Sequence, residues 1–314
     1  MASPVSFIDP RAPWPWLQEV QAATGRQDWD ALVGLMDRHA DTLESFARLA
    51  LAAADVQGAE DWLEVVVADR PGDVRARCLL GERTVALAWE RRTGKRAQYL
   101  TEEEARGHQT TLLGGEIRLR DWVAEDPSQP GYWSLRVVSG MGLGVGLSEI
   151  TRRYRRLEAL APLHYPGARR YLLALFPKWY GTLDAALTFA RQRAAAAPEG
   201  SLLRALPVDV YADRWLMEPE ADVVPLLKRR ETRDELVAAG RGSVLSAAHV
   251  AFPESGTVHS NLALLLGKGE WWADAWPHFA ALGDAPVMAS WGTLKEPAGA
   301  YAQFYDRARQ AGER

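Results

Sequence analysis

Apolar side chains recur every three or four positions along most of this chain, and this spacing limits what it can fold into. The pattern is clear in two stretches, at Trp29, Leu32, Val33 and Met36 and again at Leu183, Ala186, Leu187 and Ala190. Because an α-helix has 3.6 residues per turn, each set lies on one helix face. Few segments show the period of two that strands require. The sequence therefore predicts an all-α fold.

Three short segments place a glycine, then an acid, then a tryptophan at the start of an expected helix. They are residues 25–29, 58–62 and 267–271, and residues 181–185 repeat the pattern without the ring. Glycine lets the chain reverse, the acid lies near the positive helix end, and the ring packs on the preceding helix. Such starts are typical of helix-hairpin arrays, in which stacked pairs form a curved α-solenoid with a concave surface. Their uneven spacing predicts an irregular, tetratricopeptide-like array.

The glycine-rich stretch 139–146, Ser-Gly-Met-Gly-Leu-Gly-Val-Gly, is the expected hinge of the chain. It would separate an amino-terminal half, residues 1–140, from a carboxyl-terminal half, residues 147–314, unless the chain is one continuous domain. Its glycines alternate with side chains, so neither G-x-G-x-x-G nor the P-loop pattern is present. We expect close helix packing or a flexible hinge here, and no nucleotide-binding loop.

The composition argues against several classes of function. A formal charge of −4 over 314 residues gives no general attraction to phosphate backbones or anionic lipid, so nucleic acid is not an expected partner. The one cysteine, Cys78, can form no internal disulfide, and its helical surroundings predict a buried thiol. The chain shows no signal-peptide pattern and no apolar run of membrane-spanning length. We expect a cytoplasmic protein that does not bind membranes.

A basic run at residues 152–156, Arg-Arg-Tyr-Arg-Arg, raises the alternative of an RNA-binding patch. The apolar stripe of the same helix contains Ile150, Tyr154, Leu157 and Ala161. The arginines therefore fall on the sides and back of the helix, where we expect a solvated face paired with acids on neighbouring helices. The RNA alternative predicts an affinity that falls steeply as salt rises.

The six histidines form no metal-binding motif. H-E-x-x-H is absent, no pair has ligand spacing with a third ligand nearby, and no G-x-S-x-G nucleophile motif is present. We expect no metal and no cofactor. His164, Tyr165 and His249 would form an acid–base or metal cluster only if the fold brought them together, and ordinary packing is their expected role.

The joint, residues 176–182, is the segment Phe-Pro-Lys-Trp-Tyr-Gly-Thr between two expected helices. Its proline is expected to stop the first helix, its glycine to reverse the chain and its threonine to cap the next helix. A structural role explains every residue except the adjacent rings of Trp179 and Tyr180. With Lys178 beside them, these rings make a ligand or partner contact the competing interpretation.

Three features follow one another from the joint: Pro-Lys-Trp at 177–179, an alanine-rich helix at 183–197 and Pro-Glu-Gly-Ser at 198–201. In this order they resemble an uncharacterised bacterial family, the domain-of-unknown-function family numbered four-zero-three-four. The chain departs from the family motif at Tyr180, a glycine in the family, and at Thr182, a serine there. The likeness covers roughly residues 25–216. It implies an all-helical fold and supplies no reaction.

On such an array, the expected function is to hold a peptide or protein partner in a concave groove, with a small molecule as a further candidate ligand. The candidate binding residues are His164, Tyr165, Lys178, Trp179, Tyr180 and His249. The alternative is an enzyme with a proton-transfer pocket at the seam between the halves, which would use His164, Tyr165, Lys178 and His249. A deep closed cavity around these residues would favour the enzyme, and an open groove would favour the binding protein.

Overall fold

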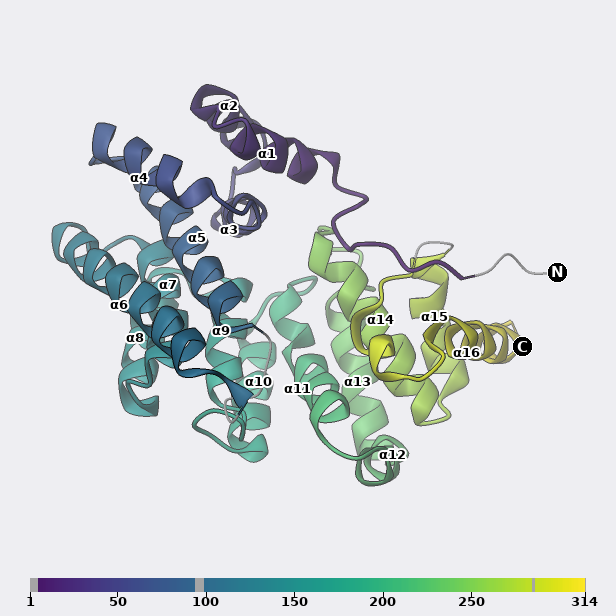
Figure 1. Cartoon of the computed structure of the whole chain (residues 1–314). Helices are drawn as coiled ribbons and strands as arrows, with labels where there is room; N and C mark the ends of the chain where they lie inside the picture. The colour runs from purple at the N-terminus through teal and green to yellow at the C-terminus, as the bar shows by residue number, and fades with distance from the viewer. Residues whose placement is uncertain (1–4, 94–98, 284–285, 314) are drawn as a thin grey trace. The chain divides into compact units, whose positions relative to one another are not determined.

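The computed structural model describes residues 5–93, 99–283 and 286–313, and over these residues the protein is all α-helical (Figure 1). They contain sixteen α-helices and two short 3-10 helices. Within the same ranges, the strand-like pairing is limited to an isolated bridge between Ile8 and Val287. The predicted all-α fold class is confirmed.

The chain folds as two compact units. Unit 2 comprises residues 14–182, and unit 1 combines the segment before Trp14 with residues 183–314. The helices of unit 2 are α1 (Pro15–Gly25), α2 (Trp29–His39), α3 (Leu43–Ala54), α4 (Ala59–Asp69), α5 (Val74–Arg92), α6 (Glu102–Glu125), α7 (Pro130–Leu143), α8 (Leu147–Leu160) and α9 (Tyr165–Ala174). Those of unit 1 are α10 (Leu183–Ala196), η2 (Leu202–Ala205), α11 (Leu206–Met217), α12 (Glu220–Leu227), α13 (Arg230–Gly242), α14 (Pro253–Lys268), α15 (Trp272–Leu282), η3 (Ala289–Thr293) and α16 (Pro297–Gly312).

This division differs from the expected one at the glycine-rich stretch, which lies inside unit 2. Residues 139–143 continue α7, and residues 144–146 make the tight turn into α8. The break falls instead after the joint, between Thr182 and Leu183. The glycines at 139–146 therefore do not link the two units.

The helix starts follow the local signals of the sequence. Asp28 caps α2, because its side chain accepts a hydrogen bond from the Ala31 amide at 3.0 Å. Gly58 precedes α4 with a positive φ of 79°, a conformation that suits glycine. Thr101 and Glu104 form the capping box predicted before α6. These short-range bonds place the helix starts.

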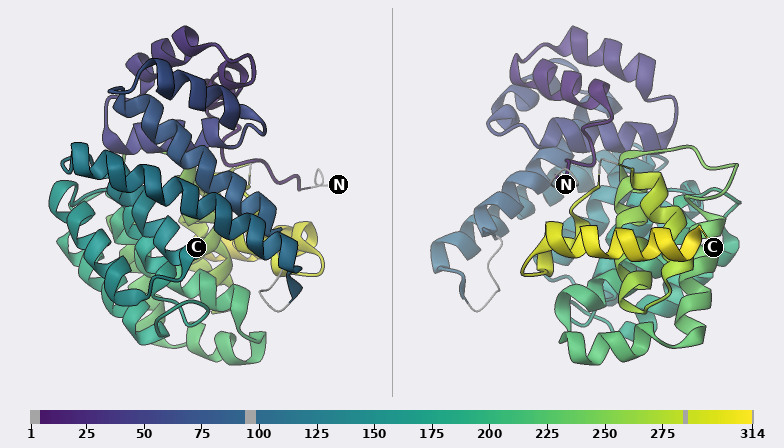
Figure 2. Two further views of the ribbon diagram at one scale, coloured as in Figure 1. Left: turned by 60° about the vertical axis from the view of Figure 1, so that its left-hand side comes forward. Right: turned by 90° about the vertical axis from the view of Figure 1, so that its right-hand side faces the viewer.

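Consecutive helices of unit 2 pack against one another. The long helices α5 and α6 lie side by side in Figure 1 and in the left view of Figure 2, and α7 packs on α6 and on α8. Pairwise packing of neighbours in sequence is what a helix-hairpin array requires. The solenoid and tetratricopeptide-like descriptions stay predictions.

The core of unit 1 explains part of the high tryptophan content. Trp291 is completely buried, and its ring centroid lies 5.1 Å from that of Tyr301. Phe279 from α15 also lies 5.1 Å from Tyr301, in an edge-to-face arrangement. Each such pair stabilises the fold by about 0.5–1.5 kcal/mol beyond the contribution from burying the rings. These rings stabilise the packing of η3, α15 and α16.

The four alternating glycines at 140, 142, 144 and 146 serve two physical purposes. A Cβ on Gly140 would lie 2.9 Å from the Arg153 guanidinium, and one on Gly142 would collide with Leu112 of α6. Gly144 and Gly146 instead have φ values of 74° and 86°, which end α7 and begin α8. The close-packing interpretation is therefore correct for the first two glycines, and the last two permit the turn.

Replacing Gly142 by alanine is expected to lower the free energy of unfolding by about 1–3 kcal/mol, because the Leu112 side chain is buried and must move. Gly114→Ala is the matched control. It lies inside α6 with open space at its Cβ position, so alanine there should raise stability by about 0.5–1 kcal/mol. Urea unfolding followed by circular dichroism measures both. Equal effects of the two changes would contradict the packing role of Gly142.

Candidate functional site

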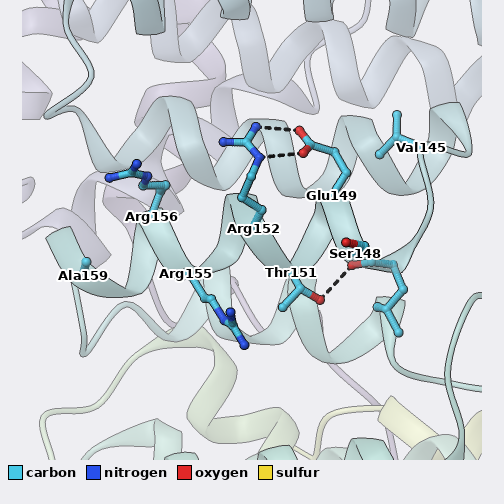
Figure 3. Close-up of a pocket in the computed structure, with 9 residues that line it drawn as sticks. Val145, Ser148, Glu149, Thr151, Arg152, Arg155, Arg156 and Ala159 are labelled. Carbon is cyan, nitrogen blue, oxygen red and sulfur yellow. Dashed lines mark hydrogen bonds and ion pairs between the residues drawn. The ribbon is translucent and has the colours of Figure 1, made fainter.

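A surface depression in unit 2 lies over the exposed side of α8, with a volume of about 960 Å³ (Figure 3). We call it the α8 surface, and its residues are Val145, Leu147, Ser148, Glu149, Thr151, Arg152, Arg155, Arg156 and Ala159. All of them come from α8 and the turn before it. The site is therefore a shallow surface, shaped by long arginine side chains, and not an enclosed cavity.

The sequence of α8 explains why these residues face outward. Ile150, Tyr154 and Leu157 are buried at i, i+4 and i+7, and they fix the inward face of the helix. The ring of Tyr154 stacks on Tyr171 of α9 with a centroid distance of 4.3 Å. The side chains at 148, 152, 155 and 159 consequently lie on the opposite face. The predicted apolar stripe is confirmed at these three positions.

The four arginines of the run 152–156 have different environments. Arg152 forms a bidentate ion pair with Glu149, with N–O distances of 2.6 and 2.7 Å (Figure 3). Arg155 and Arg156 are exposed, and no hydrogen bond or ion pair with another described residue engages their guanidinium groups. Arg153 is only 4 % exposed, so the expectation of a solvated run is wrong for this residue.

Arg153 is buried because it belongs to an ion-pair network between α6, α7 and α8. Its Nη2 lies 3.0 Å from the Glu116 carboxylate, and its Nη1 donates to the Arg136 carbonyl at 2.6 Å. Glu116 also accepts from the Arg136 guanidinium at 2.9 Å and from the Ser139 hydroxyl at 2.6 Å. These bonds satisfy the buried charges, as burial of charge requires.

Glu149 links this buried network to the α8 surface. Its carboxylate accepts from the exposed Arg152 and, at 2.8 Å, from the buried Arg153. The hydrogen bonds from Arg152, followed by those from Arg153, lower the pKa of Glu149 to about 2 despite its partial burial. The residue is therefore ionised at all ordinary pH values and neutralises part of the positive charge at the surface.

The joint contributes its rings to a second cluster in unit 2. Trp179 meets Trp89 of α5 edge to face, with a centroid distance of 5.9 Å, and Trp89 also contacts His108 of α6 at 4.8 Å. The Tyr180 hydroxyl donates to the Met141 carbonyl at 2.8 Å. Trp179 and Tyr180 are half-buried. The two adjacent rings thus tie the joint to α5 and α7, which gives them a structural role.

The backbone of the joint explains its glycine. The amides of Trp179 and Gly181 donate to the Phe176 carbonyl at 2.9 and 3.4 Å, which closes a tight turn. A Cβ at residue 181 would collide with the Leu175 carbonyl, so glycine is required by close backbone approach. Lys178 is exposed at the outer side of the turn, with its Nζ 5.4 Å from the Phe176 ring centroid.

His164 and Tyr165 lie at the start of α9, away from the joint. His164 is 5 % exposed and caps the helix, because its Nδ1 accepts from the Gly167 amide at 3.2 Å. Burial, together with the nearby cations of Arg170 and Arg48, lowers the pKa of His164 to about 3. The ten residues of α9 span about 15 Å, so His164 and Lys178 flank opposite ends of one helix.

His249 belongs to unit 1 and holds the loop before α14. Its Nδ1–H donates to the Gly200 carbonyl at 2.7 Å, so its Nε2 accepts from the Ser255 hydroxyl at 2.9 Å. Ser255 in turn accepts from the Phe252 amide at 2.9 Å. This chain of bonds anchors the loop and uses both ring nitrogens of His249. The other five candidates, His164, Tyr165, Lys178, Trp179 and Tyr180, lie in unit 2.

The other chemistry-bearing groups give no further site. Cys78 is buried, as predicted, and burial raises the pKa of its thiol. Over the described ranges, no three histidine, cysteine or acidic side chains are grouped so that they could hold a metal ion. No helix in those ranges is both long enough and apolar enough to cross a bilayer.

The basic run 152–156 was recognised in the sequence, but the acids that pair with Arg152 and Arg153 were not. Glu149 has a local signal, because it lies three residues before Arg152 on a helix. Glu116 has none, since it lies 37 residues before Arg153. Trp89, the ring partner of Trp179 in the joint, is likewise remote in sequence.

No protein-family model matches the chain, and neither does any curated protein or solved structure. The resemblance over residues 25–216 to the domain-of-unknown-function family therefore stays a prediction.

Proposed function

We propose that this protein is a helical binding or scaffold protein and that its α8 surface holds an acidic segment of a peptide or protein partner. The observation that carries the proposal is the adjacent pair Arg155 and Arg156, two exposed cations that are paired with no acid in the described chain. Exposed arginines are well suited to bind carboxylates and other oxyanions in a bidentate manner.

The shape of the site supports a segment over a small ligand. The depression is long and shallow, and its residues extend from Val145 to Ala159 along one helix. A small molecule usually binds where a concave pocket encloses most of its surface. The apolar groups at the two ends, with arginines between them, fit an extended or helical segment that carries both acidic and apolar side chains.

The charge distribution favours a protein partner over nucleic acid. The chain as a whole carries a formal charge of −4, and the cations of the α8 surface are confined to residues 152–156. A nucleic-acid site needs an extended basic track that follows the phosphate backbone. We place this function in the cytoplasm, in line with a single, buried cysteine.

The enzyme alternative has less support. Its residues His164 and Tyr165 are buried at one end of α9, Lys178 is exposed beyond the other end, and His249 lies in unit 1. His164 and His249 already use ring nitrogens to hold the backbone or a hydroxyl group. A proton-transfer role would require them to give up those bonds.

The test compares two matched double variants, Arg155→Gln/Arg156→Gln and Arg229→Gln/Arg230→Gln. Both remove two adjacent exposed arginines, the first pair from the α8 surface and the second from the start of α13. A short fluorescent peptide rich in Asp, Glu and Leu should bind the wild-type chain, and the α8 variant should weaken binding about tenfold. The α13 variant should bind like the wild type.

Fluorescence anisotropy measures the affinities, and a peptide with Lys in place of the acids checks that charge matters. Equal affinities of the two double variants for the acidic peptide would reject the α8 surface as the binding site. Equal binding of the acidic and basic peptides would reject the charge argument.

A further inference from the structure

We propose that the α8 surface selects a phosphorylated serine or threonine in the bound segment over an aspartate or glutamate. This inference rests on the proposed function and names the chemical class of group that the site recognises.

The first argument is the geometry of the arginines. Arg152 and Arg156 are four residues apart on α8, so their Cβ atoms are neighbours, about 5–6 Å apart. Both side chains extend on the same side of the helix axis as Glu149, whereas Arg155 extends on the other side (Figure 3). Two arginine side chains whose Cβ atoms are this close are long enough to bring their planar guanidinium groups onto different oxygens of one tetrahedral phosphate group. A planar carboxylate has only two oxygens to share between them.

The second argument is the charge. Three arginines and one glutamate leave the α8 surface with a formal charge of +2. A phosphate monoester carries about −1.5 to −2 at neutral pH, whereas a carboxylate carries one negative charge. Arg152, Arg156 and Glu149 carry a net charge of +1 on one side of the helix, and Arg155 on the other side brings the surface to +2. The phosphate monoester therefore gains more from this positive charge than a single acidic side chain does.

The third argument is the position of Glu149. It already occupies the Nε and Nη2 edge of Arg152, the edge that a bidentate ligand would use. An arriving anion must displace this carboxylate or share the guanidinium with it. A dianion competes better than a monoanion, so Glu149 acts as a built-in competitor that disfavours simple acidic segments.

The structure also indicates that Glu149 can be changed without removing the support of α8. Arg153 would lose one partner, but it retains Glu116 at 3.0 Å and the Arg136 carbonyl at 2.6 Å. Neutralising Glu149 should therefore free Arg152 and leave the buried network in place.

The experiment uses the full chain and one peptide sequence with serine, glutamate or phosphoserine at its centre, between acidic and leucine residues. The wild-type protein should bind the phosphoserine peptide about tenfold more tightly than the glutamate peptide. Glu149→Gln should tighten binding of the phosphoserine peptide about fivefold. Arg156→Lys keeps the charge but loses the planar guanidinium group, so it should weaken binding of the phosphoserine peptide about fivefold and that of the glutamate peptide only about twofold.

The outcomes separate this inference from the proposed function. If the glutamate and phosphoserine peptides bind equally, the inference is wrong while the proposed function stands. If neither peptide binds, both are wrong. If inorganic phosphate or free phosphoserine competes as well as the whole peptide, the site takes a small phosphorylated molecule and the peptide inference is overturned. Thermal melting of each variant shows whether it is folded, and Arg156→Lys keeps the test decisive if Glu149→Gln does not fold.

Discussion

Changing Glu116 to glutamine should lower the free energy of unfolding by about 3–5 kcal/mol. The substitution keeps the shape of the side chain but removes the carboxylate that Arg136 and Arg153 share. Arg153 retains Glu149 at 2.8 Å, whereas Arg136, which is only 8 % exposed, loses the carboxylate it pairs with. An uncompensated buried cation is costly because the protein interior cannot replace the water that would solvate it. Urea unfolding followed by circular dichroism gives the free energy directly.

The control for this prediction is Glu64→Gln in α4. Glu64 pairs with Arg118 at 2.7 Å, a shorter distance than in the Glu116 pairs, but its side chain is 52 % exposed. Water and salt screen such a pair, so its loss should change stability by no more than about 1 kcal/mol. If both substitutions cost the same, burial is not what makes the network of Glu116 important.

Lowering the pH below about 6.5 should destabilise the protein through its buried histidines, most of all His164, His259 and His278. Burial, as the largest cause, lowers the pKa of His259 to about 4 and that of His164 and His278 to about 3. The unfolded chain therefore binds protons that the folded chain excludes. The contribution of these histidines to the free energy of unfolding is fully present above the unfolded pKa of about 6.5. It falls by about 1.4 kcal/mol per pH unit for each histidine as the pH drops towards the folded pKa values.

Two replacements of His278 test this prediction. Its Nδ1 lies 3.0 Å from the Nδ1 of His259, so one ring donates and the other accepts in the neutral pair. His278→Asn keeps a polar partner and His278→Phe keeps the volume of a ring, so their stabilities at neutral pH will differ. Both should nevertheless reduce the loss of stability by about 1.4 kcal/mol per pH unit in urea unfolding between about pH 6 and about pH 5. An unchanged slope in both variants would show that protonation of His278 does not drive the loss.

The joint shows how far local reasoning reaches. Its proline, glycine and threonine correctly indicate a break between two helices, but α9 ends at Ala174 and not at Phe176, the residue before the proline that was expected to stop it. The difference arises because the Tyr180 amide turns back to the Ala174 carbonyl at 3.2 Å. The function of Trp179 was left open by the sequence, since its partner Trp89 is 90 residues away.

The sequence by itself determined the all-α class, the helix starts and the inward face of α8. Each depends on bonds or periodicities within a few residues, such as the capping box at Thr101 and Glu104 or the stripe through Ile150 and Tyr154. These features are local and can be recognised in one chain.

Only the tertiary structure decided which arginines are buried in ion pairs and which are exposed. Arg152 and Arg153 are neighbours in a basic run, yet one lies on the α8 surface and the other is buried against Glu116 of α6. The difference depends on which helices pack on α8, and therefore on contacts between residues far apart in sequence. Periodicity shows which side of a helix is apolar, but it does not identify the acid that will meet a buried charge.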